Sequence, residues 1–197
     1  MTPPKHVQKI YGVRDIAHIP DLNVVLAAVG FSREKREPER IQGDIAVKLN
    51  PFEDRVKSSA KGKANIYAIS AKTEALWIRI DPVRVLKWCV EHAGWNSPPE
   101  HVLSSPAYAH AYLIEQSSTL TASPGSVREI TRSIGYSAAA PFHLLHSIAH
   151  VLMLTARRHS GYDSQSLTEY LMPMDLSFLV YVTSVQNYTA GGLLTLS

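Results

Sequence analysis

Apolar and polar residues alternate along several short stretches of the chain, which is the pattern of a strand with one buried face. The clearest stretch is 41–49, where Ile45, Val47 and Leu49 occupy every second position. The apolar run at 22–31 fits a buried strand and a short helix equally well, because periodicity does not separate the two in so short a run. Strands are predicted at residues 9–14, 41–49, 66–69, 75–80 and 176–184, with the third and fourth forming a hairpin around residues 72–74.

Residues 141–158 carry the strongest helix signal in the chain. Pro141 suits the first turn of a helix, and the adjacent Arg157 and Arg158 complement the partial negative charge at a helix C-terminus. An earlier helix is predicted to begin after Asp81, whose side chain suits the N-cap and is followed by a proline. Helices are thus predicted at residues 83–92, where a glycine ends the helix, and at 107–116, 141–158 and 163–171.

Small polar residues gather at 117–125, which is the most linker-like segment of the chain. It separates an N-terminal α+β portion, 1–120, from a C-terminal portion, 121–197, and we expect the two to form one compact unit. The elements together predict an α+β (mixed α/β) fold, in which a small mixed sheet packs with several helices around a long central helix near 141–158.

The last residues of the chain form an unusual ending. Gly191 and Gly192 are followed only by a few apolar residues, although such a turn normally leads into another element. We therefore expect a C-terminus that is incomplete or is completed by a partner. We also expect the lone chain to be sticky, because the strand at 176–184 and the apolar residues 193–196 would expose an edge.

Composition places the chain among folded proteins, since 45% of its residues are hydrophobic and 19% are charged. Its net charge of +3 permits contact with a polyanion without requiring it. No apolar stretch approaches the roughly 20 residues that span a bilayer, and residues 1–10 lack an apolar signal core, so we expect a cytoplasmic protein without membrane contact. The single cysteine, Cys89, can form neither an internal disulfide nor a four-ligand zinc site and is predicted to be buried.

Three histidines form a row on the long predicted helix. His143, His146 and His150 are spaced i, i+3 and i+7, which places them within an arc of about 60°. Two histidines four residues apart can bind a metal ion, but the helical metalloprotease motif requires a glutamate after its first histidine, and Ser147 follows His146 here. We therefore predict histidines that pack and hydrogen-bond at a helix interface, and no metal ion bound by this chain.

Basic and aromatic residues interleave around Trp77 and Arg79 and again at Lys87 and Trp88, a pattern that suits base stacking. We favour the alternative in which both tryptophans fill the core and both basic side chains face water. A pair of arginines at a helix end suits contact with phosphate better. Candidate residues for contact with nucleic acid or a partner are Arg157, Arg158, Lys61, Lys63, His146 and His150.

Several common catalytic and nucleotide-binding motifs are missing from the sequence. It contains no nucleophile elbow, no phosphate-binding loop and no dinucleotide-binding fingerprint. Its acidic residues are scattered and do not pair in a way that indicates acid–base catalysis. We therefore predict that the chain is not an enzyme and holds no cofactor.

A set of short segments occurs in a fixed order along the chain. In the C-terminal part they are LLHSIAHVL at 144–152, GYDSQSL at 161–167, VYV at 180–182 and GGL at 191–193, and earlier segments are FSR at 31–33 and EALWIRID at 74–81. Together they resemble the DrmB family, the helicase-associated domain of DISARM anti-phage defence that also occurs at the C-terminus of MrfA-type DNA-repair helicases. The similarity touches most of the chain and is dense only from Phe142 to Leu193.

The resemblance implies a non-catalytic accessory subunit of a bacterial defence complex, which partners a superfamily-2 helicase or other ATPase and contacts DNA through that complex. The family continues past the Gly–Gly turn into a four-cysteine zinc cluster that this sequence lacks, so zinc is expected only if that cluster is supplied elsewhere. Two alternatives stay open. One is a metal-dependent nuclease or hydrolase that uses His143, His146 and His150, and the other is a structural bridging subunit without nucleic-acid contact.

Overall fold

The structure, a computed structural model, describes residues 12–28, 30–31, 50–52, 65–117, 131, 134–160, 162, 166–183 and 193. The chain divides into two compact units. The first contains Met1–Leu22 and Thr73–Ser197, and the second contains Asn23–Lys72.

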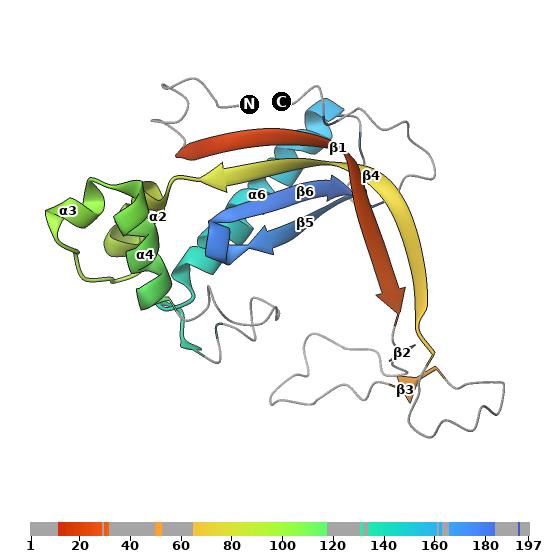
Figure 1. The fold of residues 1–197 in the computed structure, drawn as a ribbon, viewed down its shortest axis with the longest axis horizontal. Helices are drawn as coiled ribbons and strands as arrows, with labels where there is room; N and C mark the ends of the chain where they lie inside the picture. The colour runs from red at the N-terminus through yellow and green to blue at the C-terminus, as the bar shows by residue number, and fades with distance from the viewer. Residues whose placement is uncertain are drawn as a thin grey trace. The chain divides into compact units, whose positions relative to one another are not determined.

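A four-stranded antiparallel sheet forms the framework of the first unit, in the order β1-β4-β6-β5 (Figure 1). Its strands are β1 (Val13–Ala28), β4 (Tyr67–Ile80), β5 (Leu167–Met172) and β6 (Ser177–Val182), of which β1 and β4 continue into the second unit. Together with the helices, this sheet confirms the predicted α+β fold. The strand predicted at 176–184 is confirmed as β6, but it is not an edge as expected, because it pairs with β4 on one side and β5 on the other.

Helices supply the rest of the described part of this unit. They are α2 (Pro82–His92), α3 (Glu100–Leu103), α4 (Pro106–Gln116) and α6 (Ala140–Ser160), with a 3-10 turn, η3, at Pro173–Asp175. Helix α6 crosses one face of the sheet and is the long helix predicted near 141–158 (Figure 1). Among the described helices, none combines the length and apolar character that crossing a membrane requires.

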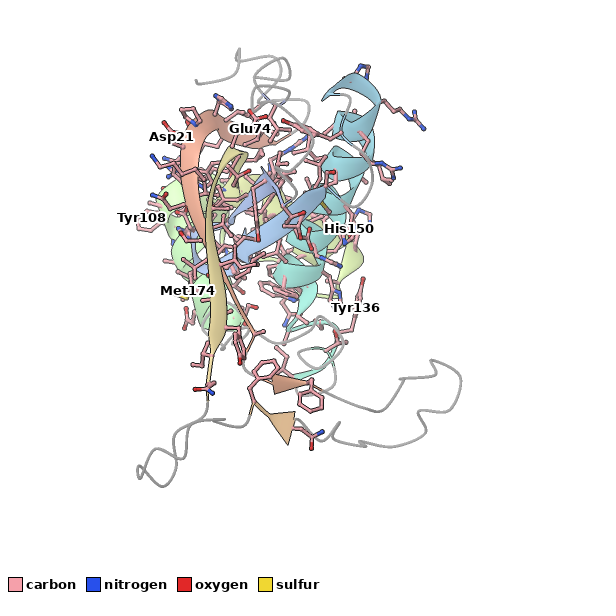
Figure 2. The ribbon with its side chains drawn as sticks, turned by 90° about the vertical axis from the view of Figure 1, so that its right-hand side faces the viewer. Asp21, Glu74, Tyr108, Tyr136, His150 and Met174 are labelled. Carbon is pink, nitrogen blue, oxygen red and sulfur yellow. The ribbon has the colours of Figure 1, made fainter. Side chains whose placement is uncertain are left out.

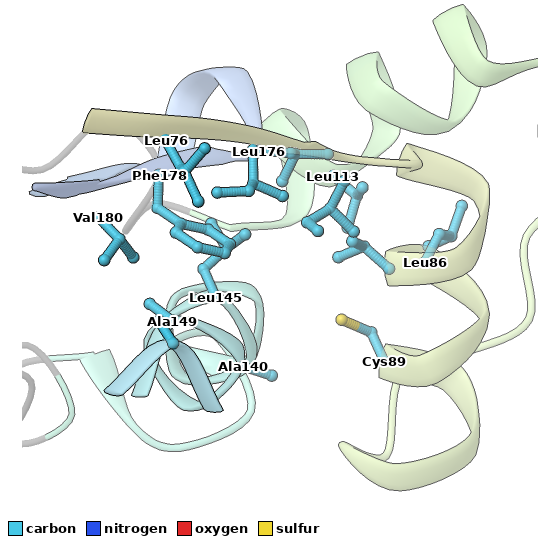
Figure 3. Close-up of a cluster of buried hydrophobic side chains, with 14 of the residues drawn as sticks. Leu76, Leu86, Cys89, Leu113, Ala140, Leu145, Ala149, Leu176, Phe178 and Val180 are labelled. Carbon is cyan, nitrogen blue, oxygen red and sulfur yellow. The ribbon is translucent and has the colours of Figure 1, made fainter. Parts of the chain in front are cut away.

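The hydrophobic core lies between α6 and the sheet. Leu145 and Ala149 on α6 are fully buried and face Phe178 and Val180 of β6 (Figure 3). Leu76 of β4 joins them from the next strand. The core thus takes residues from both the 1–120 and the 121–197 portions, and burying each large apolar side chain contributes roughly 1.5–3 kcal/mol.

Helix α2 begins where the sequence predicts. The Asp81 Oδ1 atom accepts hydrogen bonds from the backbone N–H groups of Val83 and Arg84, at 2.7 and 3.3 Å. At the other end the chain turns through Gly94, whose φ of +73° is a conformation that favours glycine. Cys89 is fully buried on the inner side of this helix, as predicted.

The hairpin predicted around residues 72–74 is wrong, because β4 runs through them without a turn. These residues include no glycine, proline or asparagine, so nothing local enforces a turn. Tertiary contacts instead stabilise the extended conformation. The Thr73 hydroxyl donates to the Val182 carbonyl at 2.7 Å, and the side chain of Glu74 is buried.

The helix predicted at 163–171 is also wrong in its described part, since Leu167–Met172 forms strand β5. All six of its residues pair with β6, from Leu167 opposite Val182 to Met172 opposite Ser177. The apolar residues Leu167 and Leu171 are four positions apart, so they share a face in a strand and also in a helix. Over six residues, periodicity alone does not distinguish the two structures.

The second unit contains a two-stranded ladder of β2 (Gly30–Phe31) and β3 (Asn50–Pro51). Aromatic contacts accompany it, since the ring of Phe52 lies 5.9 Å from Phe31 and 4.9 Å from Tyr67. In its described part, the apolar run at 22–31 is therefore strand rather than helix. The predicted strand at 41–49, the loop that holds Lys61 and Lys63, residues 118–125 of the linker-like segment and the glycine pair at 191–192 lie outside the described residues.

Candidate functional site

The central sheet has two faces with different side chains, because successive residues of a strand point to opposite sides. We call the side covered by α6 the inner face, and it carries Phe178 and Val180 of β6. We call the other side the outer face. The pairing of β6 with its neighbours places Trp77, Arg79, Leu179, Tyr170 and Tyr181 on that outer face.

Glu169 is an acidic residue in an apolar row. It lies opposite Val180 and between Leu167 and Leu171 on β5, so alternation sends its carboxylate to the inner face, toward α6. Its side chain is only 15% exposed. A carboxylate at such a position costs free energy unless it is paired with a donor or a cation.

Two histidines of α6 provide that pairing. His146 Nδ1 hydrogen-bonds to Glu169 Oε1, and His150 Nε2 lies 3.6 Å from the same oxygen. The two rings meet edge to face at 4.3 Å, because residues four apart on a helix are neighbours. The second oxygen, Glu169 Oε2, is buried and has no hydrogen-bond partner among the described residues. These three side chains offer ligand atoms that all lie within 4.8 Å of one another.

His143 takes no part in this group, although the sequence places it in the same row. Its Nε2 lies 2.7 Å from the hydroxyl of Thr131, and its ring packs on Tyr136 at 5.1 Å. Burial lowers the pKa of His143, and the neighbouring His146 lowers it further. The row of three histidines is therefore split, because His143 contacts Thr131 and Tyr136 while the other two gather around Glu169.

A second acid of the inner face, the buried Glu74, is the centre of a hydrogen-bond network. Its Oε1 accepts from the Tyr162 hydroxyl at 2.5 Å and from the Leu193 backbone N–H at 3.2 Å. Its Oε2 lies 2.9 Å from His18 Nε2 on β1. The network joins parts of the chain up to 119 residues apart. The one signal for it in the sequence is an acid directly before the apolar strand residues 75–78, and such a neighbour does not by itself distinguish a buried carboxylate from an exposed one.

The outer face presents aromatic side chains in register. Trp77, Leu179 and Tyr170 lie opposite one another on β4, β6 and β5 and form a row across the three strands. Tyr181 lies beside this row, and burial raises its pKa, with a smaller contribution from Tyr170. Tyr170 is 59% exposed, and no described helix covers this face.

Arg79 is held against the aromatic row. Its guanidinium lies 4.4 Å from the centre of the Trp77 ring, which is within cation–π distance. It also pairs with Asp15 and Asp175, each at 3.5 Å. The expectation that Trp77 fills the core while Arg79 faces water is wrong, because residues two apart on a strand share a face and both are half-buried there. On α2 the same expectation fits, since Trp88 packs on the core and Lys87 is exposed.

The remaining candidate contact residues lie at the end of α6. Arg157 and Arg158 are exposed in its last turns, as the sequence predicts, and Val151 and Leu154 are exposed earlier on the helix. Figure 2 shows His150 on the same helix. Lys61 and Lys63 lie outside the described residues.

One recess of about 450 Å³ opens beside α2 and α4. Trp95, Tyr112 and Tyr136 are among its lining residues. The Trp95 indole N–H already donates to the Ser137 carbonyl at 2.9 Å, and the described lining has no carboxylate, imidazole or amine. The recess therefore has no side chain suited to catalysis or metal binding, and the two faces of the sheet are the stronger candidates for a functional site.

Comparison with known proteins identifies no relative: no family model matches the chain, and neither a curated protein nor a solved structure matches it. The resemblance to the DrmB family therefore stays a prediction from the quoted segments.

Proposed function

We propose that this chain is a non-catalytic accessory subunit of a bacterial anti-phage defence complex, and that it binds single-stranded DNA on the outer face of its sheet. The resemblance to DrmB supports the first part of this proposal, in which the chain forms a complex with a superfamily-2 helicase or translocase. The observation that supports DNA contact is the aromatic row of Trp77, Leu179 and Tyr170.

Aromatic side chains on a sheet favour unpaired bases. Every base has a flat face that can stack on an aromatic ring, and these faces are accessible only where the strand is not paired. Trp77 and Tyr170 stand two strands apart, which is about 10 Å. That spacing lets two bases of one strand each stack on its own ring. A helicase partner would supply such unpaired DNA.

The charges on this face predict that stacking, rather than attraction of phosphate, dominates the affinity. Arg79 faces two carboxylates, so its charge is largely neutralised and its role is to hold the Trp77 ring. Arg157 and Arg158 are exposed on α6, which covers the inner face, so they are candidate contacts for a partner rather than for DNA on the outer face. The logarithm of the binding constant is therefore expected to fall only slowly with the logarithm of salt concentration, with a slope between zero and about −1.

The test compares two tyrosines of equal exposure. Tyr170→Ala removes a ring from the proposed face, whereas Tyr108→Ala removes a ring that is 60% exposed on α4. Loss of one stacked base costs about 1–3 kcal/mol, so Tyr170→Ala is expected to weaken binding of a fluorescent oligothymidine by roughly 5- to 150-fold. Tyr108→Ala is expected to leave it unchanged.

Fluorescence anisotropy measures both affinities, with an unlabelled duplex of the same length as competitor. Equal affinities of the two variants would overturn the proposed face. Absence of binding by the wild-type chain, alone and with its co-purified helicase, would instead favour the structural bridging subunit.

A further inference from the structure

We propose that His146, His150 and Glu169 form a binding site for one divalent transition-metal ion, with Zn²⁺ as the preferred ion. The site lies on the inner face of the sheet, where α6 crosses β5. This inference goes beyond the proposed function, because it concerns the face opposite to the aromatic row and does not depend on DNA binding.

The distances already approach those of a zinc site. Zinc bonds to histidine nitrogen and carboxylate oxygen measure about 2.0–2.2 Å, so the ligand atoms of a tetrahedral site lie roughly 3.3–3.5 Å apart. His150 Nε2 and Glu169 Oε1 are 3.6 Å apart, and all three ligand atoms lie within 4.8 Å of one another. His146 Nδ1 and Glu169 Oε1 lie closer together than two ligands of one zinc ion, so a side chain has to rotate to admit the ion.

The hydrogen bond between His146 and Glu169 marks where the ion would bind. A proton now joins His146 Nδ1 to Glu169 Oε1, and both atoms are ligands once that proton has left for solvent. The other oxygen, Glu169 Oε2, is buried without a donor among the described residues, which is costly for a carboxylate. A bound cation would offset this cost, whereas a neutral histidine pair leaves a negative charge on the inner face.

The ligand set selects the class of ion. Two imidazoles and a carboxylate suit zinc and its transition-metal neighbours, whereas Mg²⁺ and Ca²⁺ require mostly oxygen ligands. Three protein ligands leave a fourth position open, as in zinc sites that keep a water molecule. His150 is 54% exposed, so this position is accessible to solvent. His143 is not a ligand, because its Nε2 is engaged by Thr131.

The experiment titrates Zn²⁺ into the full-length, untagged, chelator-treated chain in competition with a chromogenic zinc chelator. We expect one ion per chain and an increase in melting temperature, because the ion binds the folded state. Loss of a ligand is expected to weaken binding at least about 100-fold in His150→Ala and in Glu169→Gln, since even partners behind a ligand contribute about 10- to 100-fold.

The matched control is His92→Ala. His92 is a histidine of similar exposure, 58%, and it also lies near a glutamate, 3.7 Å from Glu91. This surface pair lacks a third ligand among the described residues, so we expect its loss to leave the affinity unchanged. Circular dichroism verifies that each variant is folded, and of the two ligand variants His150→Ala is the less able to perturb folding, because the His150 side chain is half exposed and that of Glu169 is not.

Co²⁺ provides a second readout. In a four-coordinate site it absorbs visible light far more strongly than the hydrated ion, and this absorption is expected in the wild type and in His92→Ala but not in His150→Ala. Failure of the wild type to bind zinc saturably would overturn the site. Equal zinc affinity of wild type and either ligand variant would overturn it too, and neither result bears on the DNA test.

Discussion

At the scale of single residues, the buried Glu74 and the partly buried Glu169 show how an acidic side chain is accommodated on an apolar face. Glu74 is hydrogen-bonded to Tyr162, Leu193 and His18, so its charge is satisfied by the protein itself. Glu169 meets two histidines and keeps one oxygen without a partner among the described residues. The first arrangement is that of a structural anchor, and the second is that of a ligand group.

Replacement of Glu74 tests the anchor. Glu74→Gln places an amide where a carboxylate accepts, so at least one buried donor loses its partner. We expect the free energy of unfolding in urea to fall by about 1.5–3 kcal/mol. Glu91→Gln, at a side chain that is 67% exposed, is the control and is expected to change it by less than about 0.5 kcal/mol. Equal stability of the two variants would contradict the anchor.

The thiol of Cys89 offers a probe of the same core. Burial raises the pKa of Cys89 to about 12, so roughly one thiol in ten thousand is ionised at pH 8, and only the thiolate reacts. We expect the native chain to resist alkylation by iodoacetamide and to become reactive along the urea unfolding curve. Rapid labelling without denaturant would show that the helix α2 does not pack as described.

At the scale of elements, α6 serves both the core and the candidate metal site. Its buried side carries Leu145 and Ala149 against the sheet, and its flank carries His146 and His150 toward β5. Packing therefore fixes the rotation of the helix, and the rotation decides which histidines reach Glu169. Strand β5 depends on the same contact, because the described residues pair it on one side only, with β6.

Two leucines of α6 separate packing from helix propensity. Leu145→Ala leaves a cavity under Phe178 and is expected to lower the free energy of unfolding by about 2–5 kcal/mol. Leu154→Ala changes the same residue type in the same helix at a side chain that is 58% exposed, and is expected to cost less than about 0.5 kcal/mol. Urea unfolding measures both, and similar losses would mean that α6 does not pack through Leu145.

At the scale of the whole molecule, the two faces of the sheet carry different kinds of side chain. The inner face is apolar apart from Glu74 and Glu169, and the outer face combines aromatic rings with an arginine that is paired with two carboxylates. Nucleic acid and metal ion are therefore assigned to opposite sides of one sheet, and each can be tested without the other. A stable lone chain would fit this arrangement, because β6 is paired on both sides and Leu193 is buried rather than exposed.

Local signals in the sequence determined the elements whose ends depend on neighbouring residues. Asp81 caps α2, and Gly94 follows its end. Pro141 and the arginine pair at 157–158 predict the two ends of α6, and the long run between them predicts a helix. The fold class and the burial of Cys89 followed from the same patterns. The helix caps need contacts only within a few residues, and the side of an element that becomes buried follows from the spacing of its apolar residues, so the sequence carries both directly.

Tertiary structure alone decided the rest. Residues 72–74 could turn or extend, and pairing with a strand more than 100 residues away extended them. Glu169 decides which histidines contact an acid, and it lies 23 residues from His146. The segment that contains Glu169 is so short that its pattern of apolar residues fitted a helix as well as a strand. The sequence places side chains on a face of an element, but the partner across that face is chosen only when distant elements pack, because that choice depends on the register and rotation of both.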